Sequence, residues 1–195
     1  MALATLLDVV DGGDPAAPAL IVGSGGGALS RAQLRALALR AAAALRAAGV
    51  RPGDVVTIAE PNTVEFVVAF LGVALARGVA APLNQNYTPD EFKYYMEDAG
   101  ATLLLVGPAG NAAAEAAKLV PCLSFAVRVP SAGSTEEPML QVTSRSEGAA
   151  APEVPPPDGG AAAALAEPPA PEDVGLFLHT SGTTSRPKVR WVIFF

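Results

Sequence analysis

Residues 55–83 read VVTIAEPNTVEFVVAFLGVALARGVAAPL, and this stretch decides the fold class. It opens with the β-branched run Val55-Val-Thr-Ile58, which is typical of a strand that is buried on both faces. A helix is expected over 64–76, ended by Gly78, and residues 79–83 are expected to form a second short strand. A strand, a helix and a strand with short links predict a parallel pair joined by a right-handed crossover.

The same alternation continues on both sides of this unit. Ser30-Arg-Ala-Gln33 and Thr88-Pro-Asp-Glu91 are capping boxes, and they predict helices that end near Gly49 and Gly100. The remaining expected elements are strands at 102–106 and 124–129, with a helix at 112–119 between them. The sequence therefore predicts an α/β fold, a mostly parallel sheet with helices on both faces.

Residues 131–171 differ in composition from the segments around them. Proline punctuates a background of Ala, Gly, Glu and Ser, with the cluster Pro155-Pro-Pro157 near the middle. Such a segment has too little apolar surface to offset the entropy of ordering it, so we expect a flexible surface insertion or linker. Residues 174–178, Val-Gly-Leu-Phe-Leu, then predict a further strand.

The charge and cysteine content exclude several functional classes. The net charge of -6 argues against nucleic acid or anionic lipid as a main partner. The scattered basic residues are expected to form a solvated helix face and the turn after it: Arg31, Arg35, Arg40, Arg46 and Arg51. The single cysteine, Cys122, cannot form an internal disulfide and is predicted to be a small buried hydrophobic residue.

No membrane-spanning or targeting segment is expected. The N-terminus lacks a basic region and reaches Asp8 too early for a signal peptide. The most apolar run lies between Glu65 and Arg77 and is shorter than the about 20 residues that a membrane helix needs. The last residues do not resemble a peroxisomal address, so a cytoplasmic location is the default expectation.

The segment after the strand at 174–178 has the strongest chemical content. Small hydroxyl residues and Gly182 leave backbone amides free to approach the oxygens of a polyphosphate, and Lys188 adds a positive charge. We therefore predict a phosphate-binding loop made of Thr180, Ser181, Gly182, Thr183, Thr184, Ser185, Arg186, Pro187 and Lys188. The alternative is a solvated Ser/Thr-rich turn.

A Walker A loop is the other phosphate-binding motif to consider. Gly182 and Lys188 have the spacing of that motif. Pro187 stands where its second glycine should be, and Val189 replaces the hydroxyl residue that holds Mg²⁺. A P-loop NTPase is therefore disfavoured.

The segment 178–188, LHTSGTTSRPK, resembles the signature of the adenylate-forming (AMP-binding) superfamily, which includes acyl-CoA synthetases and 4-coumarate–CoA ligases. Three upstream segments match further landmarks of that family in order: LRAAGVRPGD at 45–54, PNTVEF at 61–66 and PLNQNY at 82–87. Ser185 stands where most members have Gly, and in this it is similar to the oxalate–CoA ligase branch.

The resemblance implies an ATP-dependent acid–CoA ligase, in which a carboxylate is adenylated and CoA then takes the acyl group. ATP, Mg²⁺ and CoA are the cofactors and co-substrates it implies, together with a small carboxylic acid. Residues 180–188 would hold the β- and γ-phosphates, with Mg²⁺ bridging them; no residue of this chain is assigned as a metal ligand. His179 is expected to pack at the strand end, and Tyr94 and Tyr95 to pack on their helix.

The sequence departs from the family pattern directly after Lys188, where Gly-Val and a long further region would follow. No complete catalytic set is present, so we expect an incomplete N-terminal part of the family's large domain, inactive alone. The expected division is 1–130 (α/β subdomain), 131–171 (insertion), 172–188 (strand and phosphate loop) and 189–195 (aberrant tail). The alternative function is a non-enzymatic fragment that associates with a full-length relative, or with itself, through an exposed sheet edge, or that is degraded.

Overall fold

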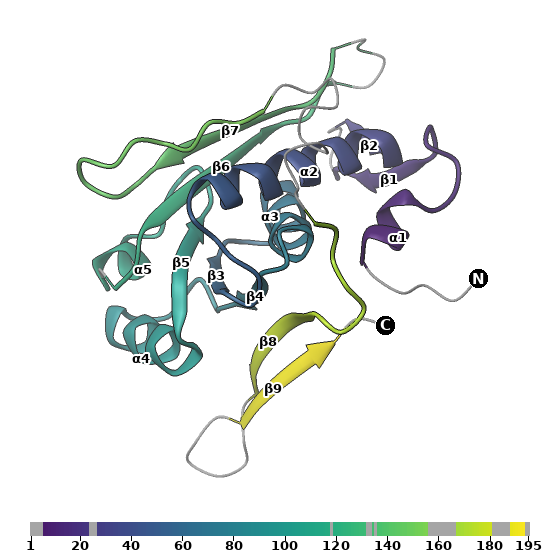
Figure 1. Ribbon diagram of the computed structural model, residues 1–195. Coiled ribbons are helices and arrows are strands. Elements are labelled where there is room, and N and C mark those ends of the chain that lie inside the picture. Colours follow the sequence, from purple (N-terminus) through teal and green to yellow (C-terminus); the bar gives the residue numbers. More distant parts are fainter. Residues whose placement is uncertain are drawn as a thin grey trace.

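The computed structural model describes residues 6–23, 27–117, 119–131, 134, 136–155, 167–180 and 188–193. The large sheet consists of β3 (Val55–Ala59), β4 (Val79–Pro82), β5 (Ala101–Val106), β6 (Cys122–Arg128), β7 (Met139–Ser144), β8 (Val174–Thr180) and β9 (Lys188–Ile193). Its order in the described part of the chain is β7-β6-β5-β3-β4-β8-β9. The inner pairs are parallel, whereas β7 and β9 are antiparallel to their neighbours (Figure 1).

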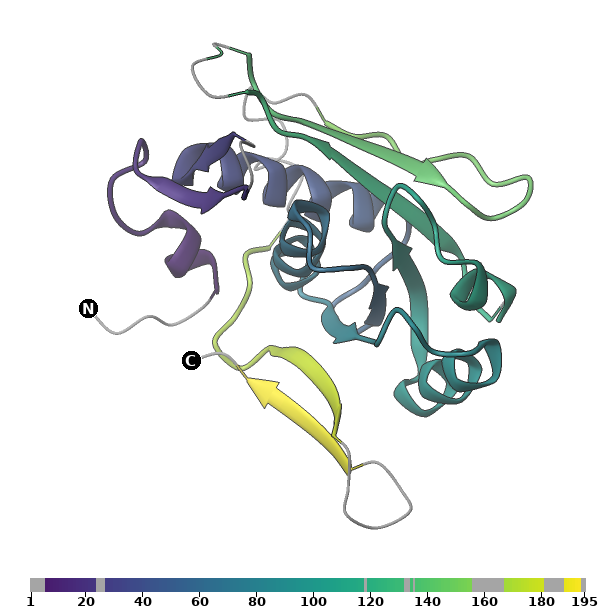
Figure 2. The same ribbon diagram turned by 180° about the vertical axis from the view of Figure 1, so that it is seen from behind.

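Helices cover both faces of this sheet, as the sequence predicts. The helices are α1 (Leu6–Asp11), α2 (Arg31–Ala47), α3 (Val64–Leu75), α4 (Pro89–Ala99) and α5 (Ala112–Ala116). Figures 1 and 2 show α2 and α3 packed together on one face, with α4 and α5 on the other. The crossover β3-α3-β4 and the crossover β4-α4-β5 run in opposite directions along the sheet. Because both are right-handed, their helices lie on opposite faces.

Local sequence signals fix the starts of the two main amphipathic helices. The hydroxyl of Ser30 accepts a hydrogen bond from the amide of Gln33 at 3.2 Å, and the Gln33 side chain accepts one from the amide of Ser30 at 3.1 Å. Thr88 and Glu91 make the same reciprocal pair at the start of α4. Both predicted capping boxes are therefore confirmed.

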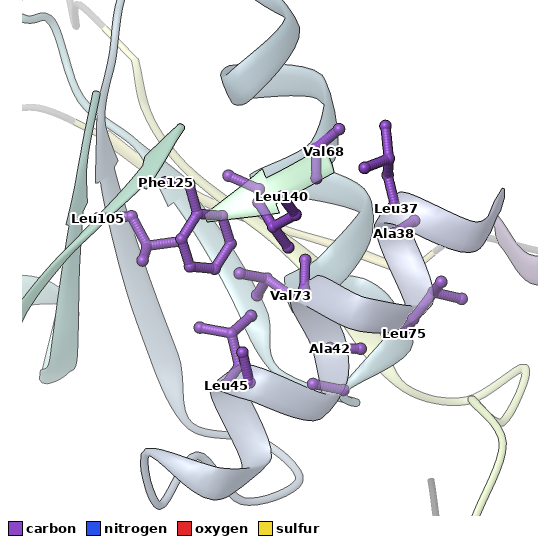
Figure 3. Close-up of a cluster of buried hydrophobic side chains, with 14 of the residues drawn as sticks. Leu37, Ala38, Ala42, Leu45, Val68, Val73, Leu75, Leu105, Phe125 and Leu140 are labelled. Atoms are coloured by element: carbon purple, nitrogen blue, oxygen red, sulfur yellow. The ribbon is translucent and has the colours of Figure 1, made fainter. Parts of the chain in front are cut away.

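The larger core lies between the sheet and the pair α2 and α3 (Figure 3). Phe125 of β6, Leu105 of β5 and Leu45 of α2 are completely buried there. The two helices approach closely at Gly72, where an added Cβ atom would lie 2.6 Å from the Cβ of Ala41. Small side chains at this crossing allow the alanine-rich α2 to pack without large residues.

Part of the predicted insertion 131–171 is a strand, and this corrects the sequence-based prediction. β7 pairs with β6 along its full length, and its Leu140 and Val142 are buried in the larger core. These two residues alone make a weak alternating pattern, so the strand depends on pairing with β6 rather than on local preference. Residues 156–166 of the insertion lie outside the described residues.

Three further differences concern short or polar features. The structure contains α1 and an antiparallel pair of β1 (Pro18–Ile21) and β2 (Ala28–Ser30), none of which we predicted. Arg40, expected on a solvated face, is only 8% exposed, and its Nε donates to the carbonyl oxygen of Pro155 at 2.8 Å. Within the expected tail 189–195, residues up to Ile193 belong to β9 and pair with β8.

Among the described residues, no helix is long and apolar enough to span a membrane.

Candidate nucleotide-phosphate site

The predicted phosphate loop follows directly after β8. Thr180 at the end of β8 and Lys188 at the start of β9 are partners across the antiparallel pair, so the two ends of the predicted loop lie next to each other. Residues 181–187, which carry Ser181, Gly182, Thr183, Thr184, Ser185, Arg186 and Pro187, lie outside the described residues. The assignment of 180–188 as the phosphate-binding loop therefore stays a prediction.

The start of β8 is joined to the rest of the sheet by a bidentate ion pair. Arg77 follows α3 with φ of 62°, a conformation that is uncommon for any residue except glycine. Its Nε and Nη2 donate to the two carboxylate oxygens of Asp173 at 2.8 and 3.0 Å, and its Nη1 donates to Glu167 at 2.6 Å. The hydrogen bonds from Arg77 lower the pKa of Asp173. Sequence analysis did not find this pair, because its partners are 96 residues apart.

The end of β8 is joined to α4 through His179. Its Nε2 lies 2.9 Å from Oδ2 of Asp98, and a carboxylate can only accept, so Nε2 carries the proton of this hydrogen bond. The His179 side chain is 5% exposed, and its Nδ1 is buried without a hydrogen-bond partner among the described residues. His179 is therefore packed at the strand end, as predicted, but it also makes a specific polar contact.

A row of aromatic rings runs from the loop after β4 to the end of β8. Tyr87 stacks on Tyr95 at 4.8 Å between ring centroids, Tyr95 meets His179 edge-on at 4.6 Å, and His179 meets Phe177 at 4.9 Å. Burial, followed by the hydrogen bond with Tyr95, raises the pKa of Tyr87. Tyr95 packs as predicted and also contacts the strand that carries the predicted loop, whereas Tyr94 meets Tyr95 edge-on but is 49% exposed.

Glu60, directly after β3, is a buried acid that sequence analysis did not single out. It is 5% exposed, and neither carboxylate oxygen has a hydrogen-bond partner among the described residues. Burial, followed by the nearby charge of Glu65, raises its pKa to about 8. The sequence signal was an acid at the end of an otherwise apolar strand.

Cys122 behaves as predicted. It is 6% exposed, and burial raises the pKa of its thiol to about 12, which keeps it protonated and unreactive. In the part of the chain that the structure describes, no cluster of three or more His, Cys, Asp and Glu side chains is arranged to hold a metal ion.

The order of the motifs along this sheet agrees with a known protein family. The family model described as "AMP-binding enzyme" matches residues 8–189, nearly the whole chain and all of β3 to β8. The chain belongs to the AMP-binding enzyme family. The segment that resembles the family signature begins at Leu178 in β8 and ends at Lys188 in β9.

Several relatives of this AMP-binding chain are named as CoA ligases. The oxalate–CoA ligase of Arabidopsis thaliana is 44% identical over 163 residues, covering 82% of this chain and 29% of that ligase. The 4-coumarate–CoA ligase-like protein 3 of Oryza sativa is 41% identical over 118 residues, covering 60% of this chain and 19% of that protein. The chain thus spans less than a third of the length of these two relatives.

A solved structure has a similar fold. The crystal structure of ATP-bound MatB from Rhodopseudomonas palustris is similar with a TM-score of 0.64 and 26% sequence identity, covering 97% of this chain and 35% of MatB. The observed fold therefore corresponds to about a third of the MatB chain.

Proposed function

We propose that this AMP-binding chain is the part of an ATP-dependent acid–CoA ligase that carries the phosphate-binding loop. The observation that carries the proposal is the segment Thr180-Ser-Gly-Thr-Thr-Ser-Arg-Pro-Lys188, which begins with the last residue of β8 in a chain of this family. The names of two relatives, an oxalate–CoA ligase and a 4-coumarate–CoA ligase-like protein, support this reaction class.

In the proposed reaction ATP supplies the adenylyl group: an oxygen of the substrate carboxylate bonds to the α-phosphorus, and pyrophosphate leaves. The CoA thiolate then bonds to the acyl carbon, and AMP leaves with the electron pair of the broken C–O bond. This chain's contribution is electrostatic. The amides and hydroxyls of 180–185 would hold the β- and γ-phosphates, and Lys188 would neutralise the charge that builds up on the departing pyrophosphate. Mg²⁺ bound with the nucleotide would supply further positive charge.

The binding part of this proposal can be tested on the chain itself. Calorimetric titration with Mg-ATP and with Mg-pyrophosphate is expected to detect binding that Lys188→Ala weakens about tenfold or more, because one charge-assisted contact is lost. Lys93→Ala is the matched control, since Lys93 is an exposed lysine of α4. Equal affinities for Lys188→Ala and Lys93→Ala would contradict the assignment of the loop.

We also propose oxalate or a similarly small dicarboxylate as the acid, from the identity to oxalate–CoA ligase and from Ser185. ATP–pyrophosphate exchange should be measured with a panel of acids that includes oxalate, malonate and 4-coumarate. Because the chain spans about a third of its relatives, we expect no exchange from it alone. Exchange by the isolated chain would contradict this expectation, and its acid dependence would identify the substrate.

The alternative is a non-enzymatic fragment that associates with a full-length relative, or with itself, through the outer edge of β9. β9 is the last strand of the sheet in the described residues, and an unpaired strand edge offers hydrogen-bonding groups to another chain. Co-purification with a full-length ligase would favour this alternative, and a concentration-independent monomer would argue against self-association. We also propose that the chain divides at residues 130, 171 and 188 and that it is cytoplasmic. The strands β7 and β9, which lie outside the range 1–130, belong to the same sheet as the α/β subdomain.

A further inference from the structure

Backbone pairing joins the hairpin of β8 and β9 to the rest of the sheet at only one described point. A single register pair, Ala80 with Leu176, joins β4 to β8 among the described residues, whereas β3 and β4 share a continuous run of pairs. Figure 1 shows the hairpin of β8 and β9 extending away from the rest of the sheet. Beyond Leu176, β8 pairs along its backbone with β9 but has no further register pair with β4 among the described residues, so its position relative to the rest of the sheet depends on side chains.

We propose that Asp98 of α4 is a positioning residue that fixes the end of β8 through His179, and so fixes the point at which the phosphate loop begins. This inference rests on the proposed function of residues 180–188. His179 immediately precedes Thr180, so its side-chain contacts set where the loop leaves the sheet.

The geometry of His179 carries the inference. The hydrogen bond to Asp98 at 2.9 Å restrains the imidazole from one side, and the rings of Tyr95 and Phe177 restrain it at 4.6 and 4.9 Å. Asp98 and Tyr95 lie three residues apart on α4 and so share one face of that helix. The side chain is thus held by a polar contact and two ring contacts from elements other than the loop.

The contacts extend beyond α4. Tyr95 stacks on Tyr87, which lies in the link between β4 and α4. Asn111 at the start of α5 donates through Nδ2 to the carbonyl oxygen of Gln85 in that link, at 2.9 Å. The end of β8 is therefore connected, through rings and hydrogen bonds, to two loops that follow parallel strands of the sheet.

The opposite end of β8 offers an internal comparison. The ion pair of Arg77 and Asp173 fixes the start of the strand, several residues from the loop. Weakening it should loosen β8 at Val174 and Gly175, and weakening the pair of Asp98 and His179 should loosen it at Leu178 and His179. The two pairs therefore make separable predictions about the same strand.

The first test follows amide hydrogen exchange in the ligand-free chain. Asp98→Ala is expected to speed exchange at Leu178–Thr180 about tenfold, and Asp98→Asn, which keeps an acceptor oxygen, about threefold. Glu97→Ala is the matched control, because Glu97 is an exposed acid next to Asp98 on the same helix, and it should change exchange less than twofold. Asp173→Ala should act at Val174 and Gly175 instead. Equal exchange for Asp98→Ala and Glu97→Ala would overturn the inference.

The second test measures the affinity for Mg-pyrophosphate by calorimetry, together with the urea midpoint of unfolding. Asp98→Ala is expected to raise the dissociation constant about tenfold, Asp98→Asn less, and Glu97→Ala and Asp173→Ala less than twofold. A purely structural role would instead lower the urea midpoint of Asp98→Ala without this ranking of affinities. If the wild-type chain binds Mg-pyrophosphate and Asp98→Ala binds it equally well, the inference about Asp98 is overturned while the proposed function stands. If the wild-type chain binds no Mg-pyrophosphate, the proposed function fails, and the exchange experiment still decides whether Asp98 fixes the end of β8.

Discussion

The core beneath α2 and α3 and the strand β8 are held in the same sheet by different forces. The core consists of close-packed aliphatic side chains and alanines, with Phe125 and Leu45 completely buried. β8 has one register pair with β4 and side-chain hydrogen bonds at both ends, Arg77 to Asp173 and His179 to Asp98. Packing volume therefore dominates the first region. β8 also buries Phe177 and pairs with β9, but polar contacts join its two ends to the rest of the sheet, so the two regions should respond differently to substitution, salt and pH.

The largest expected effect comes from emptying the core. Phe125→Ala removes a completely buried ring that packs beneath α3 and should lower the free energy of unfolding by about 3–5 kcal/mol. Urea unfolding followed by far-ultraviolet circular dichroism measures this. Met139→Ala on the neighbouring strand is the control, because Met139 is 44% exposed. A loss below about 1 kcal/mol for Phe125→Ala would show that volume does not dominate this region.

Glu60 is a buried titratable residue that directly follows β3. Its pKa is raised from 4.5 to about 8, so the folded state keeps a proton that the unfolded state releases. The free energy of unfolding should then fall as pH rises between these two values, by up to about 1.4 kcal/mol per pH unit from this group. Below pH 4.5 the stabilising contribution of the Glu60 proton is complete, and above about pH 8 it is lost.

Urea unfolding at pH 5, 6.5 and 8 tests this sign. Glu60→Gln should flatten the decline, since the amide keeps the shape of the protonated acid without titrating. Glu97→Gln, on the exposed surface of α4, should leave the pH dependence unchanged. Parallel pH curves for wild type and Glu60→Gln would show that the Glu60 carboxyl is not shielded from water.

A smaller loss is expected where the two helices of the core touch. Gly72→Ala places a Cβ atom 2.6 Å from that of Ala41, which forces α2 and α3 apart and should lower the free energy of unfolding by about 1–3 kcal/mol. Gly23→Ala is the control, because an added Cβ there meets no atom within 4 Å. A neutral Gly72→Ala in thermal unfolding would mean that the helix crossing can relax.

The smallest expected effect concerns the start of β8. Asp173→Asn should lower the free energy of unfolding by about 1 kcal/mol at low salt, and by less in 1 M NaCl, because screening weakens the lost charge pair. Since the pKa of Asp173 is lowered in the folded state, the wild-type advantage should disappear as pH falls below the ordinary value of 3.8. Glu136→Gln breaks the exposed pair with Arg128 and should have almost no effect. An equal loss at both salt concentrations would argue against a charge-based anchor.

The agreement between sequence and structure is best where the signal is local. The capping boxes at Ser30 and Thr88 act within four residues, so both helix starts could be predicted. β7 could not, because Leu140 and Val142 become a strand only by pairing with β6. Arg40 was misplaced for a similar reason: its partner, the carbonyl of Pro155, is 115 residues away along the chain.

The sequence alone determined the alternation of strands and helices, the resemblance to AMP-binding enzymes and the candidate loop at 180–188, since these depend on spacing within short segments. Only the tertiary structure decided how β8 is held, that Glu60 is buried, and that His179 contacts Asp98 just before the loop. The reason is physical: burial and ion pairing depend on residues that lie far apart in the sequence, such as His179 and Asp98, whose separation of 81 residues no local pattern encodes.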